Sequence, residues 1–469
     1  MLTFLLLQMR LTLTASSFSH NSTSTDHDLC AGAAPVVSAP PWHSVLIFPE
    51  KQQLVHKPAY LASPAAAVPC SGHPQPLRLP LPAPINCPFP VRLHPDYHSV
   101  IEECNKWGLS LFHQSSSLPE ALREAYLGCL FPLLPAAAYP SSLVSERRLV
   151  LCIKHVIWHF WLDDSIGEAD AETAAEIANA YVSLMSSPRY ADSIQYVNTR
   201  NERVIQFMER FRVEVWDEIR REMSPDLERR FATECVRSIE AMKKFSAIRS
   251  RSSSTDPCSE VDVGAAVHDR VNRKVQALIA LRLIDIFCWP YTTLLEYALG
   301  IELPDPEGKT AMGRLVQKMV KVTGKQVLLV NELLSCGKEF GMTDMSSLAG
   351  ALLEDRQRRP AGDKGGEGNI NVSVDAMQEV LREIWGMIQE EERMGVALVQ
   401  EIRSLTASPQ AADTTSVVYS KALCHVMSGN LYWTTLTWRY NGRYFVPWNT
   451  TPAYVVVQHP MPPLNFLSL

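Results

Sequence analysis

The stretch that decides the fold is residues 326–339, QVLLVNELLSCGKE. A mostly apolar run, 326–330, leads into Asn331, Ser335 and Glu339, which follow one another at intervals of four. On an α-helix these three side chains share one face and form a polar stripe. Their amide, hydroxyl and carboxylate oxygens could bind one magnesium ion, although an exposed surface stripe would have the same spacing. The apolar run before the stripe favours a helix that is buried where the stripe begins.

Helical patterns extend over most of the chain. From Asp96 onward, apolar residues recur at spacings of three and four with charges between them, which is typical of amphipathic and buried helices. The pattern predicts an all-α fold, a single bundle of about ten helices. The expected helices lie near residues 96–114, 118–132, 143–164, 170–185, 200–220, 225–248, 262–286, 289–300, 310–342, 374–406 and 413–438.

The two ends of the chain differ from this middle part. Residues 1–95 hold 15 of the 32 prolines and keep no helical or strand period. We therefore expect a disordered leader over residues 1–90, a helical domain over 91–445 and a C-terminal tail over 446–469.

Composition excludes several classes of protein. Of 469 residues, 46% are hydrophobic and 20% charged, with a net charge of -6 and no long basic run, so nucleic acid is not an expected partner. The 11 cysteines include no C-x-x-C pair, which favours a reducing, cytoplasmic location. The apolar opening, 1–9, is too short to span a bilayer, so we expect no stable membrane anchor.

A second cluster of acids follows an aromatic helix at residues 158–168, WHFWLDDSIGE. Acids at a helix C-terminus are disfavoured by the helix dipole, so something else should hold Asp163 and Asp164 there. Asp164 and Glu168 share a helix face, and carboxylate oxygens suit a hard divalent cation. A solvated helix end would also account for this run when it is considered alone.

Taken together, these residues resemble the class I terpene synthases, in particular the fungal sesquiterpene synthases. The stripe at Asn331, Ser335 and Glu339 is similar to the family's N-x-x-x-S-x-x-x-E magnesium motif, and Lys338 matches the lysine that fungal members often carry before the glutamate. The pair Asp163-Asp164 stands where the family has its aspartate-rich motif. Gly167 takes the place of the third acid of that motif, and Glu168 could substitute for it.

Two further segments match the family in the expected order. Residues 429–440, GNLYWTTLTWRY, resemble the segment whose arginine and tyrosine, here Arg439 and Tyr440, hold diphosphate. Residues 281–304 resemble the segment that carries a diphosphate-sensing arginine, which would be Arg282, with Asp285 as its linker. The flanks of Arg282 are mostly apolar, and a buried arginine needs an anionic partner.

The resemblance implies a magnesium-dependent terpene cyclase with three Mg²⁺ ions, acting on an isoprenoid diphosphate as a monomer or homodimer. The substrate would be an allylic diphosphate, most naturally farnesyl diphosphate. Asp163, Arg282 and Asp285 would be catalytic, and Lys338 would bind diphosphate together with Arg282, Arg439 and Tyr440. A central apolar pocket should protect the carbocation, with Phe160, Trp289 and Trp433 as candidate walls.

Two alternatives remain open from the sequence. One is a chain-elongating prenyl transferase of the same fold, although such enzymes would use two aspartate-rich motifs. The other is a catalytically inactive helical protein that binds partners.

Overall fold

The computed structural model describes residues 77–81, 85–111, 120–189, 193–251, 267–340, 347–358, 374–405, 414–441 and 454–457. All of them belong to one compact unit, Phe48–Leu469. Most of the predicted leader and most of the predicted tail lie outside the described residues.

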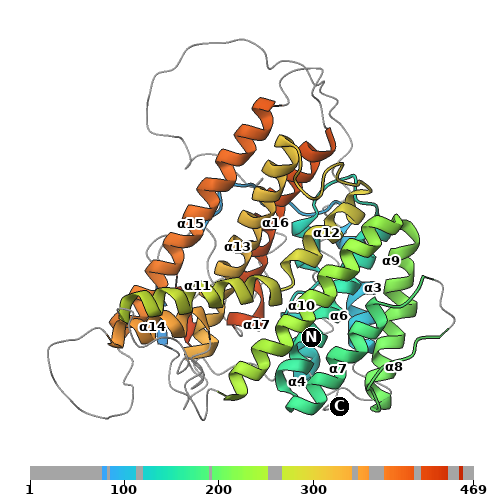
Figure 1. The fold of residues 1–469 in the computed structure, drawn as a ribbon, viewed down its shortest axis with the longest axis horizontal. Helices are drawn as coiled ribbons and strands as arrows, with labels where there is room; N and C mark the ends of the chain where they lie inside the picture. The colour runs from blue at the N-terminus through green and yellow to red at the C-terminus, as the bar shows by residue number, and fades with distance from the viewer. Residues whose placement is uncertain are drawn as a thin grey trace, which may run out of the picture. The chain divides into compact units, whose positions relative to one another are not determined.

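The described residues are mostly helical, which confirms the predicted all-α class (Figure 1). The helices are α3 (Tyr97–Ser110), α4 (Glu120–Gly128), α5 (Leu133–Ala138), α6 (Glu146–Glu168), α7 (Ala171–Met185), α8 (Glu202–Phe211), η3 (Arg212–Trp216), α9 (Asp217–Glu222), α10 (Pro225–Arg251), α11 (Val267–Asp285), α12 (Cys288–Leu299), α13 (Ala311–Phe340), α14 (Leu348–Arg358), α15 (Val374–Leu405), α16 (Thr414–Leu436) and α17 (Trp438–Asn441). Helices α5 and α14 were not predicted from the sequence.

A short strand pair joins segments that we had assigned to the leader and the tail. Strand β1 (Leu77–Pro80) pairs antiparallel with β2 (Tyr454–Val457), with Leu77 opposite Val457. Leu79 is fully buried, and residues 85–91 add further buried apolar side chains. Residues 77–81 and 85–90, which we assigned to the leader, therefore pack in the same unit as the helices, and the domain boundaries stay a prediction.

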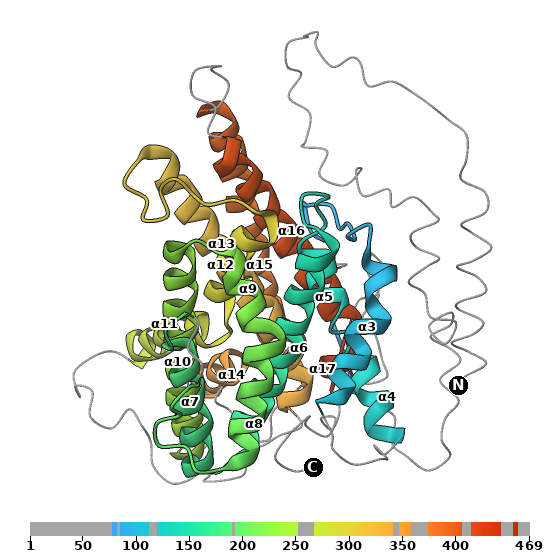
Figure 2. The same ribbon diagram turned by 90° about the vertical axis from the view of Figure 1, so that its right-hand side faces the viewer.

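Helices α13, α15 and α16 pack against one another, and α16 also packs along α5 (Figures 1 and 2). The contact with α5 is very close at Gly429, where an added Cβ would lie 2.5 Å from the backbone of Ala137. Only glycine has room at this position, because real Cβ atoms do not approach backbone so closely. Gly429 therefore fixes how near α16 comes to α5, which forms part of the cavity wall.

Local capping places the acids of α6 at its C-terminal end. The Ser145 hydroxyl accepts a hydrogen bond from the Arg148 amide at the first turn, as an N-cap residue does. Asp170 then caps the next helix, α7, by accepting from the Thr173 amide at 2.8 Å. Because α7 begins there, α6 ends at Glu168, and Asp163 and Asp164 lie in its last turns.

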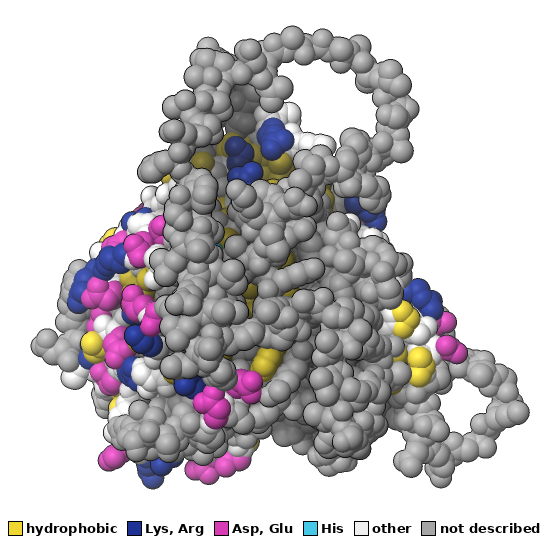
Figure 3. Space-filling view, turned by 180° about the vertical axis from the view of Figure 1, so that it is seen from behind, with side chains coloured by type: hydrophobic (Ala, Val, Ile, Leu, Met, Phe, Trp, Pro, Cys, Tyr) yellow, Lys and Arg dark blue, Asp and Glu magenta, His cyan; other side chains and the backbone are white. Residues whose placement is uncertain are grey.

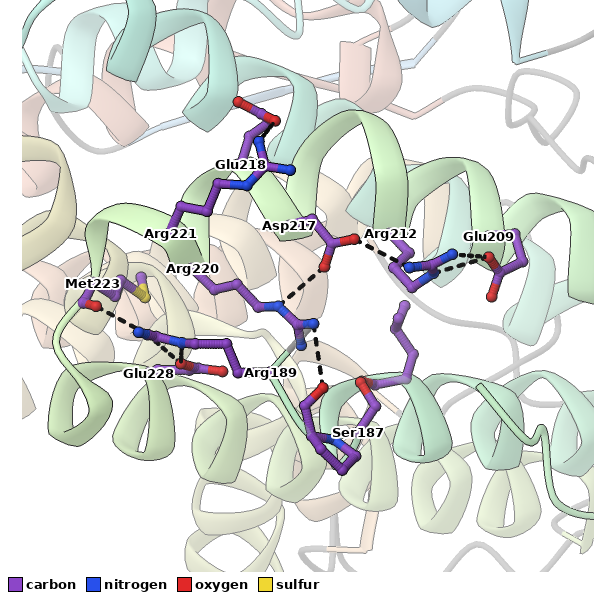
Figure 4. A network of polar contacts seen from close by, with 12 residues as sticks. Ser187, Arg189, Glu209, Arg212, Asp217, Glu218, Arg220, Arg221, Met223 and Glu228 are labelled. Atoms are coloured by element: carbon purple, nitrogen blue, oxygen red, sulfur yellow. Dashed lines mark hydrogen bonds and ion pairs between the residues drawn. The ribbon is translucent and has the colours of Figure 1, made fainter. Parts of the chain in front are cut away.

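A network of polar contacts ties the connection after α7 to α8, the π-helical turn η3, α9 and α10 (Figure 4). The buried Arg220 lies 3.0 Å from Asp217 and donates to the Pro188 carbonyl at 3.3 Å. Asp217 also accepts from Arg212 at 3.2 Å. Buried charges of this kind persist only when they are paired, so the network holds the α7–α8 connection against α9.

One stretch of the described residues, Val275–Leu299, is long and apolar enough to cross a membrane. It is not one continuous helix, because Phe287 adopts a positive φ of 64° between α11 and α12. Half of its most apolar part is buried inside the protein, as expected for a core helix. The cytoplasmic location stays a prediction. The eight cysteines among the described residues are all free and buried.

Basic and acidic side chains are interspersed over the part of the surface that Figure 3 shows in colour. On the α6–α9 side they form ion pairs such as Arg147 with Glu218 at 2.7 Å and Arg148 with Glu222 at 2.9 Å. Exposed pairs of this kind contribute little to stability but keep the visible surface mixed in charge.

Candidate active site

A cavity of about 250 Å³ lies among α5, α6, α11, α12, α13, α16 and α17. Its wall is mostly apolar, and polar side chains gather at one end. The lining residues are Leu134, Pro135, Ala138, Tyr139, Val156, His159, Phe160, Asp163, Ile166, Gly167, Met242, Arg282, Asp285, Ile286, Cys288, Tyr291, Val327, Asn331, Ser335, Ser347, Val426, Asn430, Trp433, Arg439 and Tyr440. An apolar pocket with a few convergent polar groups is the usual form of a small-molecule site.

The acids of α6 are held by an arginine from the far end of the chain. Arg439, on α17, donates to both carboxylate oxygens of Asp164 at 2.7 Å and to Asp163 Oδ2 at 2.9 Å. Its guanidinium also lies 4.8 Å from the centre of the Phe160 ring. This pairing supplies a positive charge to acids that the helix dipole disfavours at the α6 C-terminus.

A second arginine in the cavity wall is also paired with acids. Arg282, near the end of α11, donates through Nη1 to both oxygens of Asp285 at 2.9 and 3.1 Å. Its Nε donates at 2.9 Å to Glu332, and Nη2 lies 3.4 Å from Asn331 Oδ1. Burial raises the pKa of Asp285 to about 6, an effect that Arg282 opposes. The predicted arginine and its predicted linker acid are therefore in direct contact.

The two arginine clusters meet through one hydrogen bond. Asn331 Nδ2 donates to the Tyr440 hydroxyl at 2.9 Å, which joins α13 to α17. The Trp433 ring packs edge-on against Tyr440, and its Nε1 donates to the Cys129 carbonyl at 3.0 Å. Side chains from four distant parts of the sequence thus converge at one end of the cavity.

Most of the predicted site residues face this cavity. Its wall includes Asp163, Asn331, Ser335, Arg282, Asp285, Arg439, Tyr440, Phe160 and Trp433. Asp164 does not line the cavity and reaches it only through Arg439. The side chains of Glu168, Lys338 and Glu339 lie outside the described ones, although their backbones belong to α6 and α13.

Trp289, which we predicted as a pocket wall, is not among the residues that line this cavity. Its ring lies against α13 at Gly324, where an added Cβ would be 3.4 Å from Trp289. The turn at Phe287 rotates α12 relative to α11, so that Cys288 and Tyr291 face the cavity instead.

Two residues of the site were not singled out from the sequence. Glu332 is fully buried and accepts both from Arg282 and from the Leu348 amide at 2.8 Å, which links α11 to the start of α14. His159 lines the cavity one helical turn before Asp163. At both positions, the sequence feature that could have identified the residue is an ionisable side chain within an apolar run.

The oxygens at the polar end suit a hard divalent cation. Asp163, Asn331 and Ser335 offer carboxylate, amide and hydroxyl oxygens to the same cavity, the donor types that Mg²⁺ prefers. Among the described side chains, no three His, Cys, Asp or Glu residues come together as a metal site. A metal site here would therefore depend on the Asn and Ser of the stripe and on acids whose side chains are not described.

Comparison with known proteins agrees with this geometry. Residues 154–356 match the family model described as "Terpene synthase family 2, C-terminal metal binding". A (3S,6E)-nerolidol synthase from Selaginella moellendorffii is 25% identical, covering 76% of this chain and 82% of that protein. Microbial Terpene synthase-like protein 13 from the same organism is 23% identical, covering 77% and 87%.

Solved structures share the fold. The crystal structure of a-eudesmol synthase superposes with a TM-score of 0.55 at 15% identity, covering 75% of this chain and 98% of that one. Linalool/nerolidol synthase from Streptomyces clavuligerus, in complex with 2-fluorogeranyl diphosphate, gives a TM-score of 0.53 at 18% identity, with the same two coverages. The fungal type stays a prediction. Residues 154–356 thus match a terpene synthase metal-binding domain, and the chain shares its fold with solved terpene synthases.

Proposed function

We propose that this terpene synthase is a magnesium-dependent cyclase that ionises farnesyl diphosphate, cyclises the resulting carbocation and releases diphosphate. The observation that carries the proposal is the polarity of the cavity. One end gathers Asp163, Asn331, Ser335, Arg439 and Tyr440, while the rest of the wall is mostly apolar and aromatic. A charged head group and a long hydrocarbon tail have matching surroundings in such a pocket.

The polar end could stabilise a leaving diphosphate. Bound magnesium would neutralise the charge that develops as the carbon–oxygen bond breaks, and Asp163, Asn331 and Ser335 would hold it with Glu339. Arg282 and Arg439 are preorganised guanidinium groups, each of which can donate two parallel hydrogen bonds to phosphate oxygens. Each now binds carboxylates, so diphosphate would compete with Asp285 for the first and with Asp164 for the second.

The aromatic side chains of the cavity wall could protect a carbocation. Phe160, Tyr291 and Trp433 contribute aromatic faces, each of which stabilises a nearby cation by about 0.5–2 kcal/mol. Support for farnesyl diphosphate comes from the curated relative, whose name states that it makes nerolidol, a sesquiterpene alcohol. The Streptomyces clavuligerus structure was solved with 2-fluorogeranyl diphosphate, an analogue of an allylic diphosphate.

The test is an incubation of the full chain with farnesyl or geranyl diphosphate, with and without Mg²⁺, followed by diphosphate release and gas chromatography of the headspace. We expect volatile terpenes from farnesyl diphosphate only when Mg²⁺ is present. Asn331→Ala should lower release more than tenfold, since a lost oxygen ligand costs several kcal/mol of charge stabilisation. Lys318→Ala, at an exposed position of the same helix, is the control and should leave release unchanged.

Two results would contradict the proposal. If added isopentenyl diphosphate gave longer prenyl diphosphates and no volatile products, the protein would be a chain-elongating prenyl transferase. If neither substrate released diphosphate, it would be an inactive binding protein.

A further inference from the structure

The imidazole of His159 occupies an unusual position in the cavity wall. It lies four residues before Asp163 on α6, so both side chains project from the same face of the helix toward the cavity. The residue is only 4% exposed, and its Nδ1 has no hydrogen-bond partner among the described residues. A buried polar atom without a partner is costly, which suggests a functional reason for keeping it.

The surroundings of His159 are aromatic. Its ring centre lies 3.5 Å from that of Phe287, and Tyr291 presents its edge at 5.8 Å. Burial, with the positive charge of Arg439 adding to it, lowers the pKa of His159 to about 3. The ring is therefore neutral at physiological pH and offers a nitrogen lone pair without repelling a cation.

The other polar side chains of the cavity are committed or are weaker bases. Asp163 is paired with Arg439, Asp285 with Arg282, and Asn331 with Tyr440. The hydroxyl of Tyr291 and the Nδ2 of Asn430 also lack partners, but a phenol and an amide are far weaker bases than an imidazole. His159 is the strongest uncommitted base among the described residues of the cavity wall.

We propose that His159 is the proton acceptor that ends the cyclisation. This inference rests on the proposed function and assigns one step of it. After the allylic carbon–oxygen bond has broken, a carbon next to the cationic centre loses a proton to the imidazole. The electrons of that carbon–hydrogen bond form the new double bond, so the product is an olefin. The imidazolium then returns its proton to the diphosphate leaving group, which departs as hydrogen diphosphate.

The position of the base matters more than its strength in this step. A carbocation is so acidic that even a weak base takes its proton, and the nearest well-placed lone pair selects the carbon that is deprotonated. Water would otherwise compete, and the apolar wall limits its access. His159 contacts Phe287 and Tyr291 and lies one helical turn before Asp163 of the proposed head-group site.

The matched control for His159 is the neighbouring His155. It lies one turn earlier on α6 with its ring parallel at 6.4 Å, and it is fully buried among Phe211 and Phe231. It is not part of the cavity wall. The substitution His155→Phe therefore makes the same chemical change outside the site.

The experiment compares wild type, His159→Phe, His159→Gln and His155→Phe with farnesyl diphosphate and Mg²⁺, measuring diphosphate release, product profile and melting temperature. We expect His159→Phe to release diphosphate within about threefold of wild type, while the main olefin falls at least tenfold in favour of alcohols or other olefins. His159→Gln, which keeps an acceptor, should retain part of the main olefin, and His155→Phe should keep the whole profile.

Three outcomes would overturn this assignment while leaving the proposed function intact: an unchanged olefin profile in His159→Phe, equal changes in the Phe and Gln variants, or a wild-type enzyme that makes only alcohols. Equal changes would mean that side-chain shape, and not the lone pair, controls the product. A wild-type protein that releases no diphosphate would instead refute the proposed function, and this inference with it.

Discussion

The substitution Glu332→Gln tests whether the second arginine cluster is held together by a buried carboxylate. Glu332 is fully buried on α13 and accepts two hydrogen bonds, from Arg282 Nε at 2.9 Å and from the Leu348 amide at 2.8 Å. A glutamine of the same size can accept at only one of these sites. Its amide NH₂ would face a donor at the other site.

The expected cost follows from these contacts. A hydrogen bond to a charged group contributes about 1.5–3 kcal/mol, and a buried donor left without an acceptor costs about 1–3 kcal/mol. Because Asp285 still neutralises Arg282, the loss comes from unmet donors and not from an isolated charge. We expect the free energy of unfolding to fall by about 2–4 kcal/mol.

Turnover should fall as well, because Glu332 orients the arginine proposed to bind diphosphate. We expect kcat to drop at least tenfold, the effect of about 1.4 kcal/mol on the barrier, with a smaller change in KM. Burial raises the pKa of Asp285 to about 6 against the effect of Arg282, and the charge of Glu332 contributes to the rise. The acid limb of the pH–rate profile should therefore move to lower pH in the variant.

Urea unfolding and steady-state diphosphate release at several pH values measure these effects together. Glu390→Gln is the control, because Glu390 pairs with Arg393 at an exposed position of α15. That pair should contribute less than about 1 kcal/mol. If Glu332→Gln unfolds and turns over like the control, Glu332 does not position Arg282.

Three further perturbations test other parts of the structure. Arg439→Lys keeps the charge but loses the parallel contacts with Asp163 and Asp164. Diphosphate release should fall at least tenfold with a nearly normal melting temperature. A lowered melting temperature with normal release per folded molecule would instead indicate a helix-capping role. Gly429→Ala places a Cβ against the Ala137 backbone and should destabilise the protein by about 1–3 kcal/mol in thermal unfolding; unchanged stability would contradict the close packing of α16 on α5. Burial raises the pKa of Glu392, on α15, from 4.5 to about 7, although hydrogen bonds from Gln326 and Cys87 lower it. The folded protein therefore keeps a proton between pH 4.5 and 7 that the unfolded chain has released, so stability falls as pH rises through this window, and Glu392→Gln should melt higher than wild type at pH 8.

The long helices could be predicted because each carries many residues of helical periodicity, as α13 and α15 do. Helix α5 was not predicted from the sequence because it is only six residues long and contains Pro135. The β1–β2 pair was not predicted for another reason. Its two strands lie at opposite ends of the described chain, and β1 lies in Pro-rich sequence. Pairing between such distant segments leaves no local periodicity to detect.

In the site, too, local patterns could be predicted and contacts between distant segments could not. Helical spacing predicted that Asn331 and Ser335 share one helix face, and the family resemblance implied that Arg282 and Arg439 belong to the same site. The partners of these residues were not predicted. Neither Arg439 with Asp164 nor Arg282 with Glu332 follows from spacing, because each pair joins helices whose packing depends on the whole core.

The orientation of Trp289 and Tyr291 depends on one backbone angle. Phe287 adopts a positive φ of 64°, which is strained for a bulky residue and occurs mostly where the surrounding structure enforces it. Its fully buried ring against His159 supplies that constraint. With helical φ at Phe287, α11 and α12 would continue as one helix, and the side chains after Asp285 would point in other directions. The same aromatic contact therefore maintains the break that turns Tyr291 into the cavity and covers the imidazole proposed to end the reaction. The α11–α12 break, which lies within the segment 281–304, therefore belongs to the geometry of the proposed site.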